Sequence, residues 1–276
     1  PYVYDAHEFY VEESPTLSDF DRRARQLCEQ RHSQHAAAVI TVNELLASEL
    51  AQRYGIERPV VIRNVPPLFA TTDPLERPIG EPGTLRLLYH GTHIGLRQPG
   101  TDDVLRAMAR LAGEVQVRLT LRGQISGSEQ VELWRRVEAL GLTGRVAISP
   151  PVSGPTALMA AAIAGHEEVG LAFHPPLAGN FRLATSSKVY EYQMAGLAVC
   201  ATDVPGNHII LDDSAGEFYP FGDDAALAAV IRGLAMNRER LRLLRHHARA
   251  RAVTEFSWDS ERLRLLGVYD RLATRM

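Results

Sequence analysis

The sequence has 276 residues, of which 45% are hydrophobic and 23% are charged, and its formal net charge is −3 with the histidines counted as neutral. The nearly balanced charge excludes a global attraction for nucleic acid, and no apolar run approaches the roughly 20 residues that a membrane-spanning helix needs. The two cysteines, Cys28 and Cys200, are too few for a disulfide framework, so we expect a cytoplasmic protein with at most peripheral membrane contact.

The first 65 residues alternate between strand and helix patterns. We predict strands at 2–6, 38–42 and 60–64, and helices at 17–35 and 44–54. Strands that alternate with helices imply a parallel sheet. The sequence starts at Pro1 inside the first strand, so we expect an upstream part of this first domain, residues 1–65, to precede it.

Residues 66–83 contain five prolines and little periodicity. Proline at this density favours an extended, semi-rigid connection. We interpret the segment as a linker between the first domain and a second one.

The alternation resumes after the linker. We predict strands at 85–89, 117–121, 146–149, 169–173 and 198–202, and helices at 102–111, 129–140, 155–164 and around Lys188. This order predicts a second α/β domain, residues 84–255, with a doubly wound sheet. A ligand of such a domain binds beyond the carboxyl ends of the strands.

The last stretch, residues 225–276, has a helical pattern with a break at 256–258, where Ser257 can cap a terminal helix at 256–276. We expect the buried stripe of this helix to consist of Leu263, Leu266, Tyr269 and Leu272. The arginines between residues 238 and 251 are interspersed with leucines, which favours a solvated helix face over an anion-binding surface.

The strongest functional pattern lies at residues 186–202. Lys188 and Glu191 are three residues apart at the start of a short helix, which ends at Gly196 before an apolar strand. A helix N-terminus favours anions, and a lysine there adds a second attraction for phosphate. Glu191 lies on the same face and can accept hydrogen bonds from sugar hydroxyls. The pattern indicates a sugar-nucleotide site; the alternative is an ordinary ion pair on the surface of a helix.

A second candidate is the loop at residues 91–100, which follows the first strand of the second domain. A glycine such as Gly91 lets backbone amides approach a phosphate, and Arg97 can bind two of its oxygens at once. The alternative is a tight connection between strand and helix. The loop has neither the GxGxxG nor the Walker pattern, which argues against NAD binding and ATP hydrolysis.

The segment SSKVYEYQMAGL, residues 186–197, resembles the donor-binding signature of retaining glycosyltransferases of the GT-B type, in particular glycosyltransferase family 4, also called group 1. The resemblance implies an α/β fold of two Rossmann-like, doubly wound domains, of which the first is incomplete here. It also implies that the second domain binds the nucleotide-sugar donor and that the terminal helix crosses back to the first.

The resemblance also assigns roles to single residues. Lys188 would contact the donor diphosphate, Glu191 would hold the nucleotide ribose, and the backbone of Val152 would meet the base. His7, at the end of the first strand, would project into the cleft between the domains as the catalytic candidate, where an imidazole can donate or accept a hydrogen bond. The alternatives are an ordinary loop valine and a structural histidine.

The remaining diphosphate ligands depart from the family pattern. Gly91 and Arg97 match the expected loop, but Thr92 stands where many members carry an arginine. One cationic ligand is therefore unaccounted for. Arg122, at the end of a neighbouring strand, is the candidate substitute.

A further departure concerns the sugar. Members of the family carry two acids separated by seven residues, and Leu183 stands at the position of the first acid. We expect Leu183 to border the transferred sugar without a carboxylate. Asn180 and Thr185, in the same loop, are the candidate polar contacts to the sugar.

These features predict an enzyme that transfers a sugar from a nucleotide-diphosphate sugar to a hydroxyl acceptor. The resemblance implies retention of configuration and a role in glycan or glycoconjugate biosynthesis. The family favours a UDP-sugar as the substrate. Electrostatic stabilisation of the leaving diphosphate requires no metal and no obligatory cofactor. We expect no nucleic-acid partner, and the acceptor, whether a glycan, a lipid or a small molecule, is not identified.

Two alternatives stay open. A non-catalytic module that binds sugar nucleotides is favoured by Leu183 and Thr92. A nucleotide-sugar epimerase of GT-B-like fold would need further acidic residues near the sugar, which the sequence does not supply.

Overall fold

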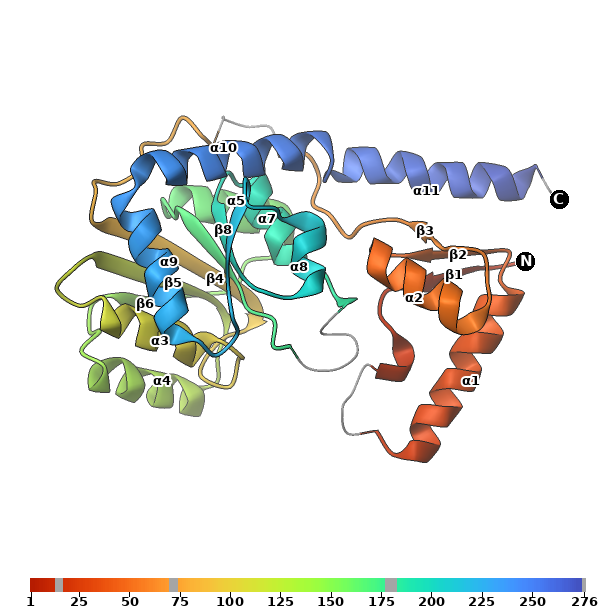
Figure 1. Ribbon diagram of the computed structural model, residues 1–276, viewed down its shortest axis with the longest axis horizontal. Coiled ribbons are helices and arrows are strands. Elements are labelled where there is room, and N and C mark those ends of the chain that lie inside the picture. Colours follow the sequence, from red (N-terminus) through yellow and green to blue (C-terminus); the bar gives the residue numbers. More distant parts are fainter. Residues whose placement is uncertain (13–16, 70–73, 177–182, 275–276) are drawn as a thin grey trace.

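The computed structural model describes residues 1–12, 17–69, 74–176 and 183–274, and the statements below concern these residues. Two parallel sheets form two lobes that lie side by side along the long axis of the molecule (Figure 1). We call the lobe with the three-stranded sheet the N-terminal lobe and the lobe with the six-stranded sheet the C-terminal lobe.

The N-terminal lobe contains β1 (Val3–Ala6), a 3-10 turn η1 (Tyr10–Glu12), α1 (Asp19–His35), β2 (Ala38–Thr41), α2 (Glu44–Tyr54) and β3 (Val60–Val61). Its strands pair in parallel in the order β1-β2-β3. The side chains of Ser18 and Asn43 cap the two helices by accepting hydrogen bonds from the first turn. The third strand is shorter than predicted, because the N–H of Arg63 donates to Glu261 instead of extending the ladder.

The C-terminal lobe is built on a sheet with the order β6-β5-β4-β7-β8-β9, in which every pair is parallel. Its strands are β4 (Thr84–His93), β5 (Gln116–Gln124), β6 (Val146–Ser149), β7 (Val169–Ala172), β8 (Ala198–Thr202) and β9 (Gly216–Tyr219). The direction in which strands are added reverses between β4 and β7. Such a switch point leaves a crevice beyond the carboxyl ends of the strands, where doubly wound proteins bind ligands.

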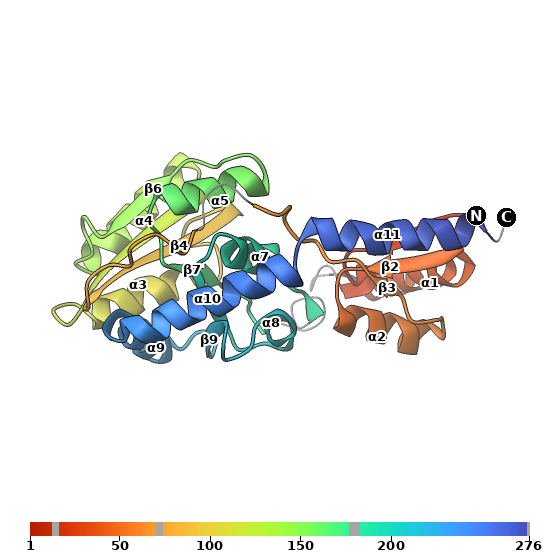
Figure 2. The ribbon, with the colours of Figure 1, turned by 90° about the horizontal axis from the view of Figure 1, so that it is seen from above.

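Helices cover both faces of the six-stranded sheet. They are α3 (Thr101–Arg110), α4 (Gly127–Ala139), α5 (Gly154–Ala164), α7 (Ser187–Met194), α8 (Pro205–Ile210), α9 (Asp224–Met236) and α10 (Arg238–Thr254). Figure 2 shows α5 on one side of the sheet and α3 and α9 on the other. Each face has its own apolar core, with Leu105 and Leu227 in one and Met159 and Tyr190 in the other. Cys200 is buried in β8, as predicted.

Two elements of this lobe were not predicted, α8 and β9. Strand β9 has four residues, two of which are Gly216 and Glu217, and α8 has six. Segments this short contain too few residues to show the regular spacing of apolar side chains from which helices and strands are predicted. Strand β9 pairs with β8 and completes the sheet edge.

The interpretation of the arginines on α10 as a solvated face is wrong for Arg245. Its side chain is buried, and its guanidinium donates hydrogen bonds to the carbonyl oxygens of Gly196 and Pro74. Arg249 similarly donates to the carbonyl oxygen of Phe69. These arginines satisfy main-chain oxygens of the proline-rich segment and of the turn after α7, which a helical pattern alone does not reveal.

The last helix, α11 (Trp258–Ala273), runs along the N-terminal lobe. Three residues of its predicted buried stripe are exposed, at 64% for Leu263, 55% for Leu266 and 51% for Tyr269. The helix instead packs through Leu265, Val268 and Leu272 against Ile40 and Ile62. Its orientation is fixed by buried Glu261, whose carboxylate accepts hydrogen bonds from the main-chain N–H and the guanidinium of Arg63, at 3.1 and 2.9 Å.

Candidate functional site

A cavity of about 330 Å³ lies beyond the carboxyl ends of β4, β5 and β6, beside the N-terminus of α7. We call it the carboxyl-end cavity. Six residues singled out from the sequence line it: Gly91, Thr92, Arg122, Val152, Lys188 and Glu191. They come from four separate segments, which the switch point of the sheet brings together. His90, Gln124, Pro151, Leu158 and Ser187 also line it and were not predicted.

Lys188 is the cation at the N-terminal turn of α7, and it is the sole lysine of the chain. Its stem passes close over Gly91, where an added Cβ would lie 3.5 Å from Lys188 Cε. None of the described residues gives its ammonium a hydrogen bond or an ion pair. Burial lowers the pKa of Lys188, and the Glu191 carboxylate opposes that shift. The ammonium is half-buried and lies 5.8 Å from the centroid of the Tyr89 ring, a weak contact that leaves its hydrogen-bond donors free for an anionic ligand.

Arg122 presents a second cation to the same cavity, from the end of β5. Its side chain is buried, and Nη2 lies 3.8 Å from Glu167 Oε1. Its other terminal nitrogen, Nη1, is buried and has no hydrogen-bond partner in the described part of the chain. Buried guanidinium nitrogens are normally paired, so this unsatisfied donor is a second indication of an anionic ligand.

Glu191 is held by His90, which directly precedes Gly91 near the carboxyl end of β4. Glu191 Oε2 lies 2.7 Å from His90 Nε2. The imidazole packs against the ring of Tyr192 at 4.6 Å, and the hydroxyl of Tyr192 accepts a hydrogen bond from the N–H of His90. The sequence position of His90 could have marked it as a site residue, because it stands near the carboxyl end of the first strand of the lobe, directly before Gly91.

Gly123 allows the ends of β4 and β5 to converge under the cavity. A Cβ at this position would lie 2.3 Å from the carbonyl oxygen of Gly91 and 2.8 Å from the side chain of Ile94. Only glycine can occupy a position with a backbone oxygen so near. The residue therefore sets the position of the loop that lies next to Lys188.

A second cavity of about 280 Å³ adjoins the first and is lined by residues of both lobes. We call it the inter-lobe cavity. Ser187 lines both cavities, and His7, Leu183 and Thr185, which were predicted to face the sugar or the acceptor, line this one. His7 Nε2 lies 3.4 Å from Asp5 Oδ2.

His174, which was not predicted, also lines the inter-lobe cavity. It follows β7, and its main-chain N–H donates to Thr202 Oγ1 at 2.9 Å. Burial, with a smaller effect from the ammonium of Lys188, lowers the pKa of His174 to about 4. A neutral imidazole thus lines the inter-lobe cavity, while the ammonium of Lys188 lines the adjoining carboxyl-end cavity.

Leu183 also links the two lobes. Its side chain packs against the apolar cluster of the N-terminal lobe, and its carbonyl oxygen accepts a hydrogen bond from Asn43 Nδ2 at 2.8 Å. The structure thus gives this position a packing contact in addition to its place on the cavity wall. Asn180 lies outside the described residues.

Arg97 lies away from the predicted residues that line the carboxyl-end cavity. Its side chain is 77% exposed, and Nε lies 3.5 Å from Glu129 Oε1. It does not line the carboxyl-end cavity. Of the basic residues predicted to meet a diphosphate, Lys188 and Arg122 are the two that converge.

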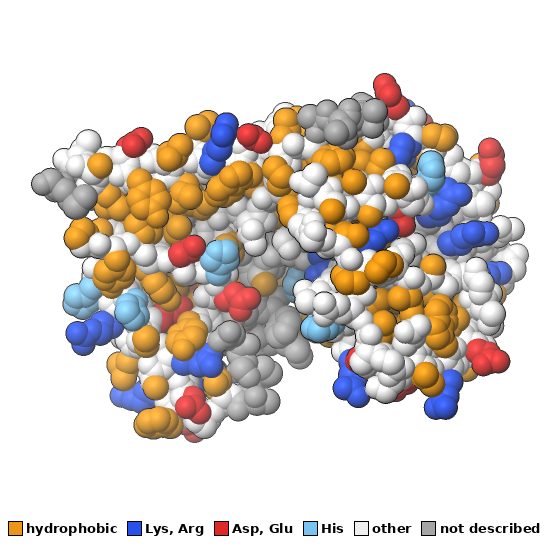
Figure 3. Space-filling view, turned by 180° about the vertical axis from the view of Figure 1, so that it is seen from behind, with side chains coloured by type: hydrophobic (Ala, Val, Ile, Leu, Met, Phe, Trp, Pro, Cys, Tyr) orange, Lys and Arg blue, Asp and Glu red, His pale blue; other side chains and the backbone are white. Residues whose placement is uncertain are grey.

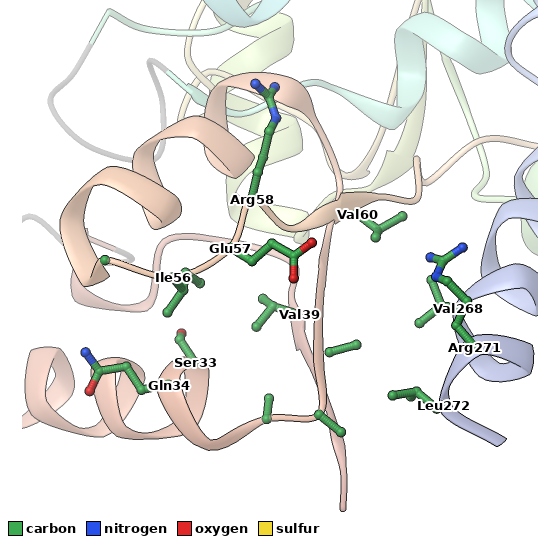
Figure 4. A pocket seen from close by; sticks show the side chains of 14 residues that line it. Ser33, Gln34, Val39, Ile56, Glu57, Arg58, Val60, Val268, Arg271 and Leu272 are labelled. Carbon is green, nitrogen blue, oxygen red and sulfur yellow. The ribbon is translucent and has the colours of Figure 1, made fainter. Parts of the chain in front are cut away.

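A further cavity, of about 490 Å³, lies elsewhere. Figure 4 shows it between α1, the amino ends of β2 and β3, and α11, with Ser33, Glu57 and Arg271 on its wall. No predicted site residue lines it. Among the described residues, no three His, Cys, Asp or Glu side chains gather as ligands for a metal ion. No described helix combines the length and the apolar character needed to cross a membrane.

Comparison with known proteins identifies relatives. The sequence profile described as "Glycosyl transferases group 1" matches residues 84–237, more than half of the chain. The D-inositol 3-phosphate glycosyltransferase of Pseudarthrobacter chlorophenolicus is 28% identical over 193 residues, which are 67% of this chain and 44% of that protein. The chain thus spans less than half of the length of this curated relative.

Solved structures show the same fold. HepE of Anabaena in complex with UDP superposes with a TM-score of 0.76 at 16% identity, over 98% of this chain and 72% of that one. Sucrose-phosphate synthase of Thermosynechococcus elongatus gives a TM-score of 0.76 at 20% identity, over 99% and 68%. The predicted GT-B fold is confirmed. With the profile match, this establishes that the chain belongs to the glycosyl transferases group 1 family.

Proposed function

We propose that this chain carries the donor site of a retaining glycosyltransferase, which moves a sugar from a UDP-sugar to a hydroxyl acceptor. The observation that carries the proposal is the pair of under-satisfied cations in one cavity. Lys188 makes no ion pair or hydrogen bond with a described residue, and Arg122 has a buried donor without a partner among them. A diphosphate offers the negative charge and the acceptor oxygens that both groups need.

The other residues that line the two cavities favour one orientation of the donor. With the diphosphate between Lys188 and Arg122, the ribose hydroxyls reach Glu191, and the base lies toward Val152 on the far wall. The sugar then points toward Ser187 and the inter-lobe cavity, where His7 and Thr185 stand. Uridine as the base is supported by HepE, a structure of the same fold that was solved with UDP and with UDP-glucose.

In the proposed reaction, negative charge develops on the diphosphate as its bond to the sugar breaks. Lys188 and Arg122 stabilise that charge from fixed positions, and the amides near Gly91 add hydrogen-bond donors. An acceptor hydroxyl enters from the inter-lobe cavity, next to His7. Closure of the lobes around the sugar would exclude water and limit hydrolysis of the donor.

The chain's sole lysine gives the donor site a direct test. Within residues 1–276, Lys188 is the one side chain that an amine-reactive reagent modifies, and its lowered pKa favours the reaction near neutral pH. We expect mass spectrometry to find Lys188 modified in the free protein and protected by UDP. Equal modification with and without UDP would contradict the donor site.

Transfer itself requires a second experiment, with the complete protein and a panel of UDP-, GDP- and ADP-sugars. Release of UDP that depends on an added hydroxyl acceptor supports the transferase. A non-catalytic binding module is the alternative, because Leu183 and Thr92 replace an expected acid and an expected arginine. Protection of Lys188 by UDP without turnover of any sugar, across a broad set of acceptors, favours the module.

A further inference from the structure

Three arginines form a row across neighbouring strands of the C-terminal lobe. Arg86 of β4 is paired in register with Arg118 of β5. The pairing of Leu119 with Val146 places Arg118 beside Arg145, which directly precedes β6. All three lie toward the amino ends of their strands, at the opposite edge of the sheet from the carboxyl-end cavity.

The row forms no ion pair with a described residue, although Glu167 lines the same cavity as the three arginines. None of the three guanidinium groups makes an ion pair or a hydrogen bond within the described part of the chain, whereas Arg136 and Arg232 each bind a carboxylate. Arg86 and Arg118 are exposed and Arg145 is half-buried, so solvent screens the repulsion between the three like charges. Their guanidinium groups have donors free to bind an anion.

The three arginines surround a cavity of about 210 Å³, which we call the arginine cavity. Thr120 and Glu167 also line it. Figure 3 views the side of the molecule on which basic side chains gather toward the right edge of this lobe. Three planar guanidinium groups around a hollow present many N–H donors to a tetrahedral oxyanion, and Thr120 adds a hydroxyl.

Glu167 limits the kind of anion that fits. Its carboxylate is buried; Oε1 lies 3.8 Å from Nη2 of Arg122, and Oε2 has no hydrogen-bond partner within the described residues. A carboxylate beside an anion is repulsive unless the ligand donates a proton to it. A phosphate group with a P–OH, or one that carries a neighbouring hydroxyl, can bind the arginines and donate to Glu167, whereas sulfate cannot.

We propose that the arginine cavity is a binding site for a phosphate group, separate from the donor site. The phosphate can belong to a soluble molecule or to a lipid headgroup, because both offer the same chemistry. The inference does not rest on the proposed transferase activity, since Arg86, Arg118 and Arg145 line no part of the carboxyl-end or inter-lobe cavities.

The test uses inorganic phosphate as the probe and the Lys188→Ala protein as the background, which weakens phosphate binding at the donor site. Calorimetry compares this background with Arg118→Gln and Arg135→Gln added to it. Arg135 is an exposed arginine of α4 that does not line the arginine cavity, so its variant controls for the loss of one charge. We expect Arg118→Gln to weaken phosphate binding at least about tenfold, Arg135→Gln to leave it unchanged, and sulfate to bind less well than phosphate.

A second arm identifies the source of the phosphate. Vesicles that contain phosphatidylglycerol are sedimented with the wild-type protein and with Arg118→Gln, and phosphatidylcholine vesicles serve as the blank. Binding to the anionic vesicles that is lost in Arg118→Gln assigns a lipid headgroup, and binding of free phosphate alone assigns a soluble ligand. The proposal is overturned if neither probe binds, or if Arg118→Gln and Arg135→Gln behave alike while circular dichroism shows both to be folded.

Discussion

Glu191 and His90 are 101 residues apart in the sequence, yet Glu191 Oε2 lies 2.7 Å from His90 Nε2 at the carboxyl-end cavity. A carboxylate can only accept a hydrogen bond, so Nε2 of the imidazole carries the proton. The pair fixes the direction of the Glu191 side chain and leaves Oε1 without a bond to any described residue. We infer that His90 positions Glu191 so that this second oxygen can accept from a ribose hydroxyl.

This arrangement predicts that His90→Ala weakens UDP binding although His90 need not touch the nucleotide. Loss of the hydrogen bond to a charged group frees Glu191 to rotate, and we expect the affinity measured by calorimetry to fall about tenfold. In His90→Gln, the amide nitrogen can donate in place of Nε2 and should restore most of the affinity. Equal losses in the two variants would show that the imidazole acts in some other way.

Only those residues of the candidate site that belong to short local sequence motifs could be predicted. Lys188, Glu191 and Gly91 belong to short motifs whose chemistry is evident from neighbouring residues. His90 is different, because its partner stands on another element. Its role requires knowing that β4 ends beside α7, which depends on the order of the strands and not on any one segment.

The lowered pKa of Lys188 predicts a pH dependence of nucleotide binding. Burial lowers the pKa of Lys188 in the free protein, and a bound diphosphate would raise it, because the anion favours the charged ammonium. Affinity for UDP is therefore full below the free-state pKa and falls as the pH rises through it, at a lower pH than an ordinary lysine would give. Calorimetry between neutral and alkaline pH measures this fall. In Lys188→Arg the guanidinium stays charged over this pH range, so the remaining affinity for UDP should not fall as the pH rises.

The close approach of β4 and β5 predicts an asymmetry between two glycines. Gly123→Ala would place a methyl group 2.3 Å from the carbonyl oxygen of Gly91, so the loop that borders Lys188 must shift. Gly127 at the start of α4 has open space around its Cα, and Gly127→Ala is the matched control. We expect a lower melting temperature and weaker UDP binding for Gly123→Ala alone. Comparable behaviour of the two variants would contradict the tight contact.

His174 predicts a loss of stability in acid. Its pKa is about 4 in the folded protein against an ordinary value of 6.5, so the unfolded chain binds the proton more readily. The folded state is favoured in full above pH 6.5, and this contribution is lost as the pH falls from 6.5 toward 4. The loss amounts to at most about 3 kcal/mol of unfolding free energy. Urea unfolding of wild-type protein and His174→Gln at several pH values should give curves that diverge over this range, and parallel curves would contradict the assignment.

The fold was predictable where apolar periods are long and regular. The order of strands and helices between residues 84 and 202 was predicted correctly, because buried parallel strands and the amphipathic helices between them have distinct patterns. The carboxyl ends of two strands were placed too early: β4 extends to His93, so that Gly91, predicted in a loop, lies in the strand, and β5 extends to Gln124. The terminal helix was recognised as a helix, but its buried face was assigned wrongly. Leucines occur on more than one of its faces, and the face that packs is chosen by the contact of Glu261 with Arg63, a tertiary interaction.

That corrected face leads to a prediction with a control on the same helix. Val268 is 1% exposed and packs against Ile40 and Ile62, whereas Leu266 is 55% exposed. Val268→Asp would place a carboxylate in an apolar contact, and we expect it to lower the unfolding free energy by about 3 kcal/mol or more. Leu266→Asp adds the same charge two residues away, on an exposed side of the helix, and should change stability by less than about 0.5 kcal/mol. Thermal unfolding of both variants decides between the two faces: if Leu266→Asp is the destabilised variant, the stripe expected from the sequence is the buried one and the packing described for α11 is wrong.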